Sequence, residues 1–146
     1  MGAKNTIDYV TVASTGNATD FGDLTSTAKC PRVGASSTRA LAGSVGGNSY
    51  NINVDYVTIA STGNALDFGD LSVASNEGGL GASNSVICLM FGGNASGVSN
   101  PQIDQFTIAT LGNATDFGDL RLVLSGSEFL NAAGGAAASN CHGGLS

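Results

Sequence analysis

The chain contains the same segment three times. The three copies read IDYVTVASTGNATDFGDL at residues 7–24, VDYVTIASTGNALDFGDL at 54–71 and IDQFTIATLGNATDFGDL at 103–120. The second residue of each copy is an aspartate, and it recurs after 47 and then 49 residues, at Asp8, Asp55 and Asp104. A fixed period of this length is typical of propellers, solenoids and related arrays, in which each repeat is one supersecondary unit. We therefore expect a single repeat domain over residues 1–146.

The pattern within one repeat predicts short β-strands. Residues 7–13 alternate with the two-residue period of a strand and carry apolar side chains on both faces. The Gly-Asn pair at 16–17 predicts a tight hairpin turn, with the return strand over 18–24. Between the copies lie two apolar stretches, 39–47 and 86–93, each preceded by small residues. Each repeat is thus expected to form about four short strands, and signals for helices are nearly absent.

Two further features give the chain a family resemblance. The apolar stretches end in Gly-Gly pairs, Gly46–Gly47 and Gly92–Gly93, and each is followed by a strand with Asp, a hairpin and an aromatic residue. This order resembles the kelch repeat of β-propellers, and the position of the kelch tryptophan is taken by Phe21, Phe68 and Phe117. The repeated segment is also similar to the kelch-like repeats in virion proteins of tailed bacteriophages, especially marine ones. The resemblance implies an all-β fold of kelch-like propeller blades and a place in the virion, after synthesis in the host cytoplasm.

The number of repeats bears on how such blades could close. Propellers have four to eight blades, and this chain has three repeats of about 48 residues. It begins at what would be the third strand of one blade and ends after the second strand of another. We therefore expect two chains to pair head to tail as a six-bladed ring, each completing the open blade of the other. The alternative is a pseudo-threefold β-trefoil or β-prism, for which three such units are also suitable.

Pairs of aspartates recur in the repeats and are candidate metal ligands. Each pair begins at an equivalent position and has its second member three residues later; the first members are Asp20, Asp67 and Asp116. Calcium takes six to eight oxygen ligands, but the dense alternation of acids found in known calcium loops is missing. Aspartate close to glycine is typical of turns. We therefore expect no metal and no other cofactor, and interpret these acids as structural repeat positions.

Composition and the scarce reactive residues argue against several function classes. The net charge is −6 and the five Lys and Arg residues are scattered, whereas nucleic-acid binding needs clustered cations. No apolar run reaches the length that a membrane span requires. Cys30, Cys88 and Cys141 form no Cys-x-x-Cys pair and are interpreted as buried small residues or free thiols. His142, the only histidine, adjoins Cys141, and neighbours on a strand point to opposite faces. With three equivalent acid pairs offering no asymmetry for catalysis, we expect no enzyme.

These observations favour a structural role. Only 11% of the residues are charged, so the surface is poorly equipped to stay apart from its neighbours. We expect a non-enzymatic structural protein of a tailed-bacteriophage virion, an appendage, decoration or fibre module, whose partners are copies of itself and other virion proteins. The alternative is a glycan-binding or receptor-binding module of the phage tail that contacts a host surface glycan through loops at 72–85 and 122–138. Sugars commonly stack on aromatic rings, and these loops hold only Phe129, which favours the structural role.

Overall fold

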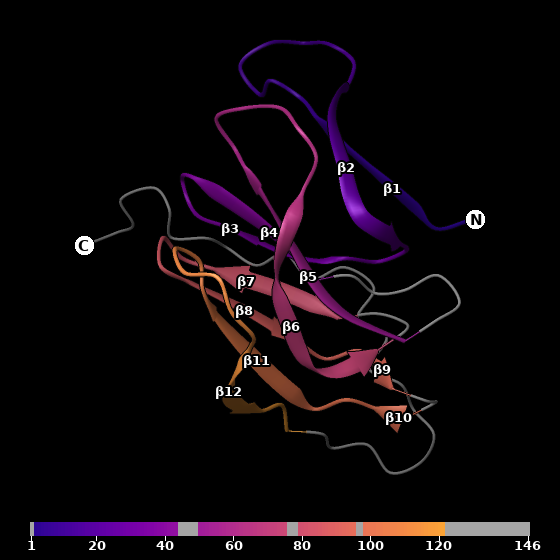
Figure 1. The fold of residues 1–146 in the computed structure, drawn as a ribbon, viewed down its shortest axis with the longest axis vertical. Coiled ribbons are helices and arrows are strands. Elements are labelled where there is room, and N and C mark those ends of the chain that lie inside the picture. Colours follow the sequence, from indigo (N-terminus) through magenta and orange to yellow (C-terminus); the bar gives the residue numbers. More distant parts are fainter. Residues whose placement is uncertain (1, 44–49, 76–78, 96–97, 122–146) are drawn as a thin grey trace.

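The computed structural model describes residues 2–43, 50–75, 79–95 and 98–121 (Figure 1). Its regular elements in these ranges are all β-strands, which confirms the predicted all-β class. They are β1 (Lys4–Tyr9), β2 (Thr19–Ala28), β3 (Arg32–Ala35), β4 (Arg39–Gly43), β5 (Asn51–Thr58), β6 (Leu66–Ser75), β7 (Leu80–Ser83), β8 (Ile87–Phe91), β9 (Asn94–Ala95), β10 (Val98–Ser99), β11 (Gln102–Thr107) and β12 (Thr115–Asp119). The described part of the chain holds no helix that could cross a membrane.

The strands form the four-stranded units that the repeat predicts. One antiparallel sheet has the order β3-β4-β5-β6, and a second has the order β7-β8-β11-β12, with the short hairpin of β9 and β10 inserted before β11. The strands β1 and β2 form a separate two-stranded sheet. They occupy the same place in the first copy that β5–β6 and β11–β12 occupy in the second and third. None of these sheets closes on itself.

The Asp-Phe-Gly-Asp sequence forms a β-bulge in every copy. In the second copy Val54 lies opposite Gly69 and Asp55 lies opposite Asp67, so Phe68 is the extra residue of the bulged strand. The pairings of β1 with β2 and of β11 with β12 shift at the equivalent points, which leaves Phe21 and Phe117 as the extra residues. The glycine after each phenylalanine has a positive φ of 140–151°, a region that favours glycine. The repeated motif thus fixes one local backbone shape three times.

The predicted tight turn at Gly-Asn is wrong. In the second copy β5 ends at Thr58 and β6 begins at Leu66, and the chain turns early, where the Ser61 amide donates to the Thr58 carbonyl over 3.3 Å. The other two copies turn in the same way. Residues 62–65 then run along a strand of the preceding copy, so Gly63 and Asn64 are held by a neighbouring repeat rather than by a two-residue turn. The predicted loop at 72–85 also differs, because β6 extends to Ser75 and β7 covers 80–83.

The hydrophobic core lies between the two four-stranded sheets. It is built by residues of strands from both sheets and by Ile108 just after β11, and it has eight buried members: Leu41, Val54, Phe68, Leu71, Cys88, Met90, Phe106 and Ile108. The edge strands β3 and β7 of the two sheets approach each other closely, since a Cβ added to Gly81 of β7 would lie 2.0 Å from the carbonyl oxygen of Val33 in β3. Figure 1 shows the β1–β2 hairpin at one end of the long axis and β12 at the other. The three copies therefore follow one another along the molecule.

Candidate functional site: the contacts between successive copies

Two backbone hydrogen bonds join each copy to the one before it. In both cases an amide in the segment before the last strand donates to a carbonyl on the outer edge of the preceding copy. The bonds are Gly63 N to Phe21 O (2.7 Å), Ala65 N to Asp23 O (2.8 Å), Gly112 N to Phe68 O (2.9 Å) and Ala114 N to Asp70 O (2.8 Å). The pairs match residue for residue, so the second copy sits on the first as the third sits on the second.

The asparagine of the repeat adds a side-chain contact in the same place. The Asn64 side-chain oxygen accepts a hydrogen bond from the Asp23 amide over 3.0 Å. One repeat later, the side-chain oxygen of Asn113 accepts from the Asp70 amide over 3.1 Å. An edge strand therefore has its amide and carbonyl groups paired by the next copy instead of being left open.

A buried aspartate completes each junction. The Asp55 carboxylate is fully buried and accepts hydrogen bonds from the Thr25 amide (2.8 Å) and the Thr25 hydroxyl (2.7 Å). Asp104, which is 3% exposed, accepts from the Ser72 amide (3.1 Å) and hydroxyl (2.5 Å). Hydrogen bonds to a carboxylate are stronger than those between neutral groups, and a buried charge needs them.

Close backbone approach explains the glycine of the bulge. A Cβ added to Gly22 would lie 2.3 Å from the carbonyl oxygen of Gly63, and a Cβ added to Gly69 would lie 2.3 Å from that of Gly112. Both values are far below any ordinary contact. The glycine therefore serves two purposes: it adopts the positive φ of the bulge, and it admits the backbone of the next copy.

The first and third copies each carry one set of the junction residues whose partners would belong to a further copy. Asp8 is exposed, and within the described residues no group hydrogen-bonds to its carboxylate or to the Asn17 side chain. At the opposite end, Gly118 keeps its φ of +140°, but a Cβ added there would have nothing within 4 Å. Arg121 follows the third copy at the position that Thr25 holds after the first, and it is exposed. Each end of the described chain thus presents one half of the junction.

The three phenylalanines at the position of the kelch tryptophan differ in burial. Phe68 is 3% exposed and makes edge-to-face contacts with Tyr56 (ring centroids 5.9 Å apart) and with Phe106 of the next copy (5.8 Å). Phe21 makes one such contact, with Tyr9, and is half-buried. Phe117 is 56% exposed, because Gln105 replaces the tyrosine of its copy and no later copy covers it within the described residues.

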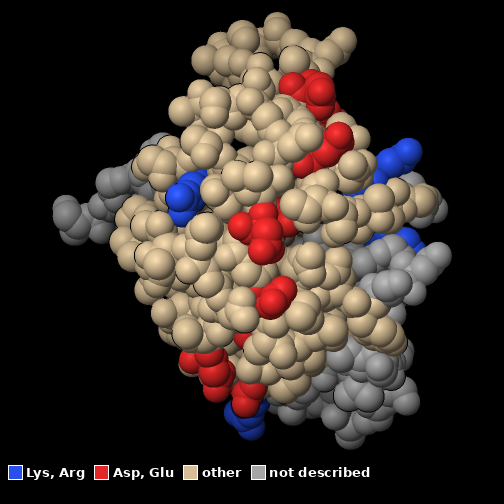
Figure 2. Space-filling model, in the orientation of Figure 1, with Lys and Arg blue, Asp and Glu red and all other residues tan. Residues whose placement is uncertain are grey.

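The predicted aspartates lie on the surface. Asp20, Asp67 and Asp116 are all exposed, and Asp116 accepts a hydrogen bond from the Gly118 amide over 2.9 Å, a local contact of the kind expected in a turn. Figure 2 shows acidic side chains in a line along the long axis, the direction in which the copies follow one another. No group of three metal-ligating side chains occurs among the residues that the structure describes. Asp20, Asp67 and Asp116 lie at equivalent positions of successive copies and do not surround one point.

The glycine pair Gly92–Gly93 lies beside a buried arginine, Arg32, whose burial was not predicted from the sequence. Gly92 and Gly93 are buried, with φ values of +75° and +103°, while Gly46 and Gly47 lie outside the described residues. Arg32, 2% exposed, donates from one Nη to the Ser75 hydroxyl (2.5 Å) and to the Gly92 carbonyl (2.8 Å). Burial lowers the pKa of Arg32 to about 10 and the charge of Asp104 opposes that shift, so the guanidinium stays protonated at neutral pH. It ties β3 and β6 to the end of β8.

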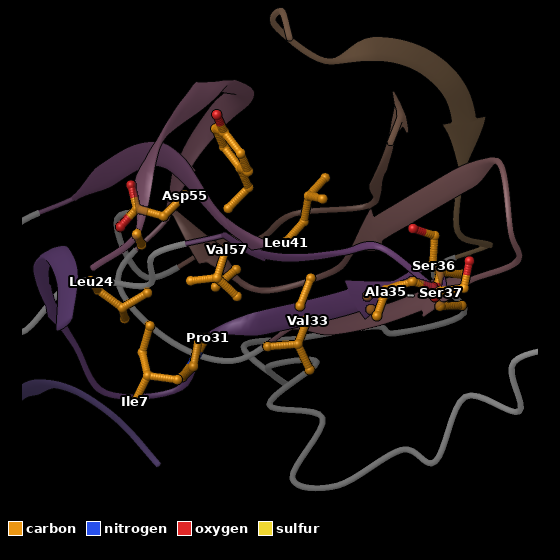
Figure 3. Close-up of a pocket in the computed structure, with 18 of the residues that line it drawn as sticks. Ile7, Leu24, Pro31, Val33, Ala35, Ser36, Ser37, Leu41, Asp55 and Val57 are labelled. Carbon is orange, nitrogen blue, oxygen red and sulfur yellow. Dashed lines mark hydrogen bonds between the residues drawn. The ribbon is translucent and has the colours of Figure 1, made fainter. Parts of the chain in front are cut away.

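A pocket of about 700 Å³ lies between the first hairpin and the β3–β6 sheet (Figure 3). Apolar side chains gather at one end of it, among them Ile7, Leu24 and Pro31, and serines 36 and 37 lie at the other end. Among the described residues that line it, Asp55 is the one acid, and Thr25 holds its carboxylate. The described lining therefore offers apolar surface to a ligand or to another segment of polypeptide, but no acid free to act as a base.

The described cysteines fit the prediction that they are free. Cys88 is fully buried, and burial raises the pKa of its thiol to about 12, so it stays protonated at neutral pH and is a poor nucleophile. Cys30 is an exposed free thiol. The pairing of Cys141 with His142, which the sequence argued against, lies outside the described residues.

Comparison with models of known protein families and with curated proteins finds no match to this chain. What the protein does must therefore be inferred from its own residues and contacts.

Proposed function

We propose that this chain is a non-enzymatic structural protein that assembles through its β-sheet repeats. The observation that carries the proposal is that the repeated residues make the contacts between successive copies. The aspartate, the asparagine and the glycine of the motif each contact the neighbouring copy, in both junctions of the chain. In a binding or catalytic protein, distinct polar groups are expected to converge on one pocket instead.

The strand edges support self-assembly. In the second and third copies, β5 and β11 are each paired on both sides, by β4 and β6 and by β8 and β12. In the first copy, β1 is paired only with β2 among the described strands. An open edge of this kind is a template for pairing with another chain, and native proteins cover such edges. We propose that copies of this chain supply the cover, with two chains closing head to tail as a six-bladed, propeller-like ring.

The resemblance of the repeated segment supports a place in the virion of a tailed bacteriophage, as an appendage, decoration or fibre module beside other virion proteins. A glycan-binding tail module is the alternative. It is less well supported because the pocket is lined mainly by apolar groups, whereas sugars need hydrogen-bonding side chains as well as an aromatic face.

Purified particles test the virion role. Tailed particles from the biological source of the gene are expected to contain this chain in many copies by quantitative mass spectrometry, and antibodies raised against it should decorate intact particles in electron micrographs. A capsid protein from the same particles is the positive control, and a lysate of uninfected host is the negative control. Recovery of the chain from infected cells but not from particles would contradict the proposal. Labelling confined to fibre tips, with binding to a host glycan, would favour the alternative.

A further inference from the structure

We infer that the third copy of one chain binds the first copy of a second chain in the register that joins successive copies within the chain, and that Arg121 of the former pairs with Asp8 of the latter. This inference rests on the self-assembly proposed above and adds the surface, the register and the residues that determine it. The occupant is a second copy because the two halves of the junction are both present, separately, on one chain.

The backbone edges are complementary. At the internal junction the carbonyls of Phe68 and Asp70 accept hydrogen bonds from the amides of Gly112 and Ala114. By equivalence, the carbonyls of Phe117 and Asp119 accept hydrogen bonds from the amides of Gly16 and Ala18 of the second chain. The Asp119 amide would likewise bind the Asn17 side chain. Gly118 already has a φ like that of the two glycines that admit a neighbouring carbonyl, and no atom of the described residues lies within 4 Å of where its Cβ would be.

Exposed apolar side chains meet in the same register. At the internal junction Phe68 packs on Phe106, and the residue at the position of Phe106 in the first copy is Val10. Phe117 is 56% exposed and Val10 is 57% exposed. Joining the two ends would therefore bury two apolar side chains that the single chain leaves in water.

The junction between chains differs from the internal ones in charge. Inside the chain the buried aspartate is bound by Thr25 or Ser72, both neutral donors. At the third copy the equivalent residue is Arg121, whose guanidinium can bind a carboxylate with two parallel hydrogen bonds. An arginine here makes the intermolecular junction an ion pair, and two chain ends of the same sign would repel. Charge thus selects head-to-tail pairing over head-to-head or tail-to-tail pairing.

Charge reversal at each end tests this inference. Asp8→Arg and Arg121→Asp should each weaken association of the full chain by about 30-fold or more, the effect of breaking a desolvated charge pair, as measured by sedimentation over a concentration series. The matched controls are Asp67→Arg and Lys29→Asp, which make the same charge changes at exposed positions of the described chain outside the proposed contact. Both controls should associate like the unmodified protein.

Mixing the two variants provides the decisive measurement. Asp8→Arg has arginine at both ends and Arg121→Asp has aspartate at both ends, so an equimolar mixture should recover association, with the two chains in equal numbers by native mass spectrometry. Recovery also shows that both variants are folded. Variants that associate like their controls, or a mixture that does not recover, would overturn the inferred contact while leaving self-assembly intact. An unmodified chain that stays single would overturn self-assembly itself, and this inference with it.

Discussion

Replacing Phe68 with alanine is expected to lower the free energy of unfolding by about 3–5 kcal/mol. Its side chain is 3% exposed, sits at the bulge between the two four-stranded sheets and touches two other aromatic rings, Tyr56 and Phe106. Truncation leaves a cavity that the surrounding strands cannot fill, and it removes the packing between the second and third copies. Urea denaturation followed by far-UV circular dichroism measures the loss.

Phe117→Ala is the matched control, because it removes the same side chain from the same motif where it is 56% exposed. It should change the free energy of unfolding by no more than about 0.5 kcal/mol. Both variants are best compared in an Asp8→Arg background, in which stability is not coupled to association. Equal losses at the two positions would mean that the third copy is covered within the single chain, contrary to the structure.

Replacing Asp55 with alanine is expected to cost about 3 kcal/mol, because the Thr25 amide and hydroxyl lose a charged acceptor inside the protein. Asp67→Ala is the control: it removes the same group from the facing strand, where it is exposed, and should change stability by about 0.5 kcal/mol or less. A double-mutant cycle with Thr25→Ala should give a coupling free energy of about 1 kcal/mol or more. Additive effects would show that the contact between the first two copies does not stabilise the fold.

Much of the fold could be predicted from the sequence because it depends on local patterns. The period of two and the recurrence of one segment indicated short strands in four-stranded units, and the sheets β3-β4-β5-β6 and β7-β8-β11-β12 have that form. The position of the turn could not be predicted from the Gly-Asn pair, because that dipeptide shows only a local preference. In all three copies the chain turns earlier, where the amides of Ser14, Ser61 and Thr110 bond to the carbonyls of Thr11, Thr58 and Thr107.

The junction between copies was harder to predict because residues of identical sequence lie in different surroundings in different copies. Asp8 and Asp55 are the same residue in nearly identical segments, yet one is exposed and the other fully buried, because burial depends on which copy lies before it. One signal was available: an aspartate repeated on a strand whose faces are both apolar needs a partner, and Thr25, Ser72 and Arg121 follow the copies as three donors. Arg32 has no repeated counterpart, so no pattern pointed to its burial.

The mass of the unmodified protein in solution tests the central claim most directly. If the repeats hold copies of the chain together as they hold one another, light scattering should give a mass at least twice the 14.4 kDa of one chain at micromolar concentration. The mass should be an integral multiple of the chain mass and should fall on dilution. A mass of 14.4 kDa that stays constant over the same concentration range would contradict the account and favour a self-contained, pseudo-threefold fold.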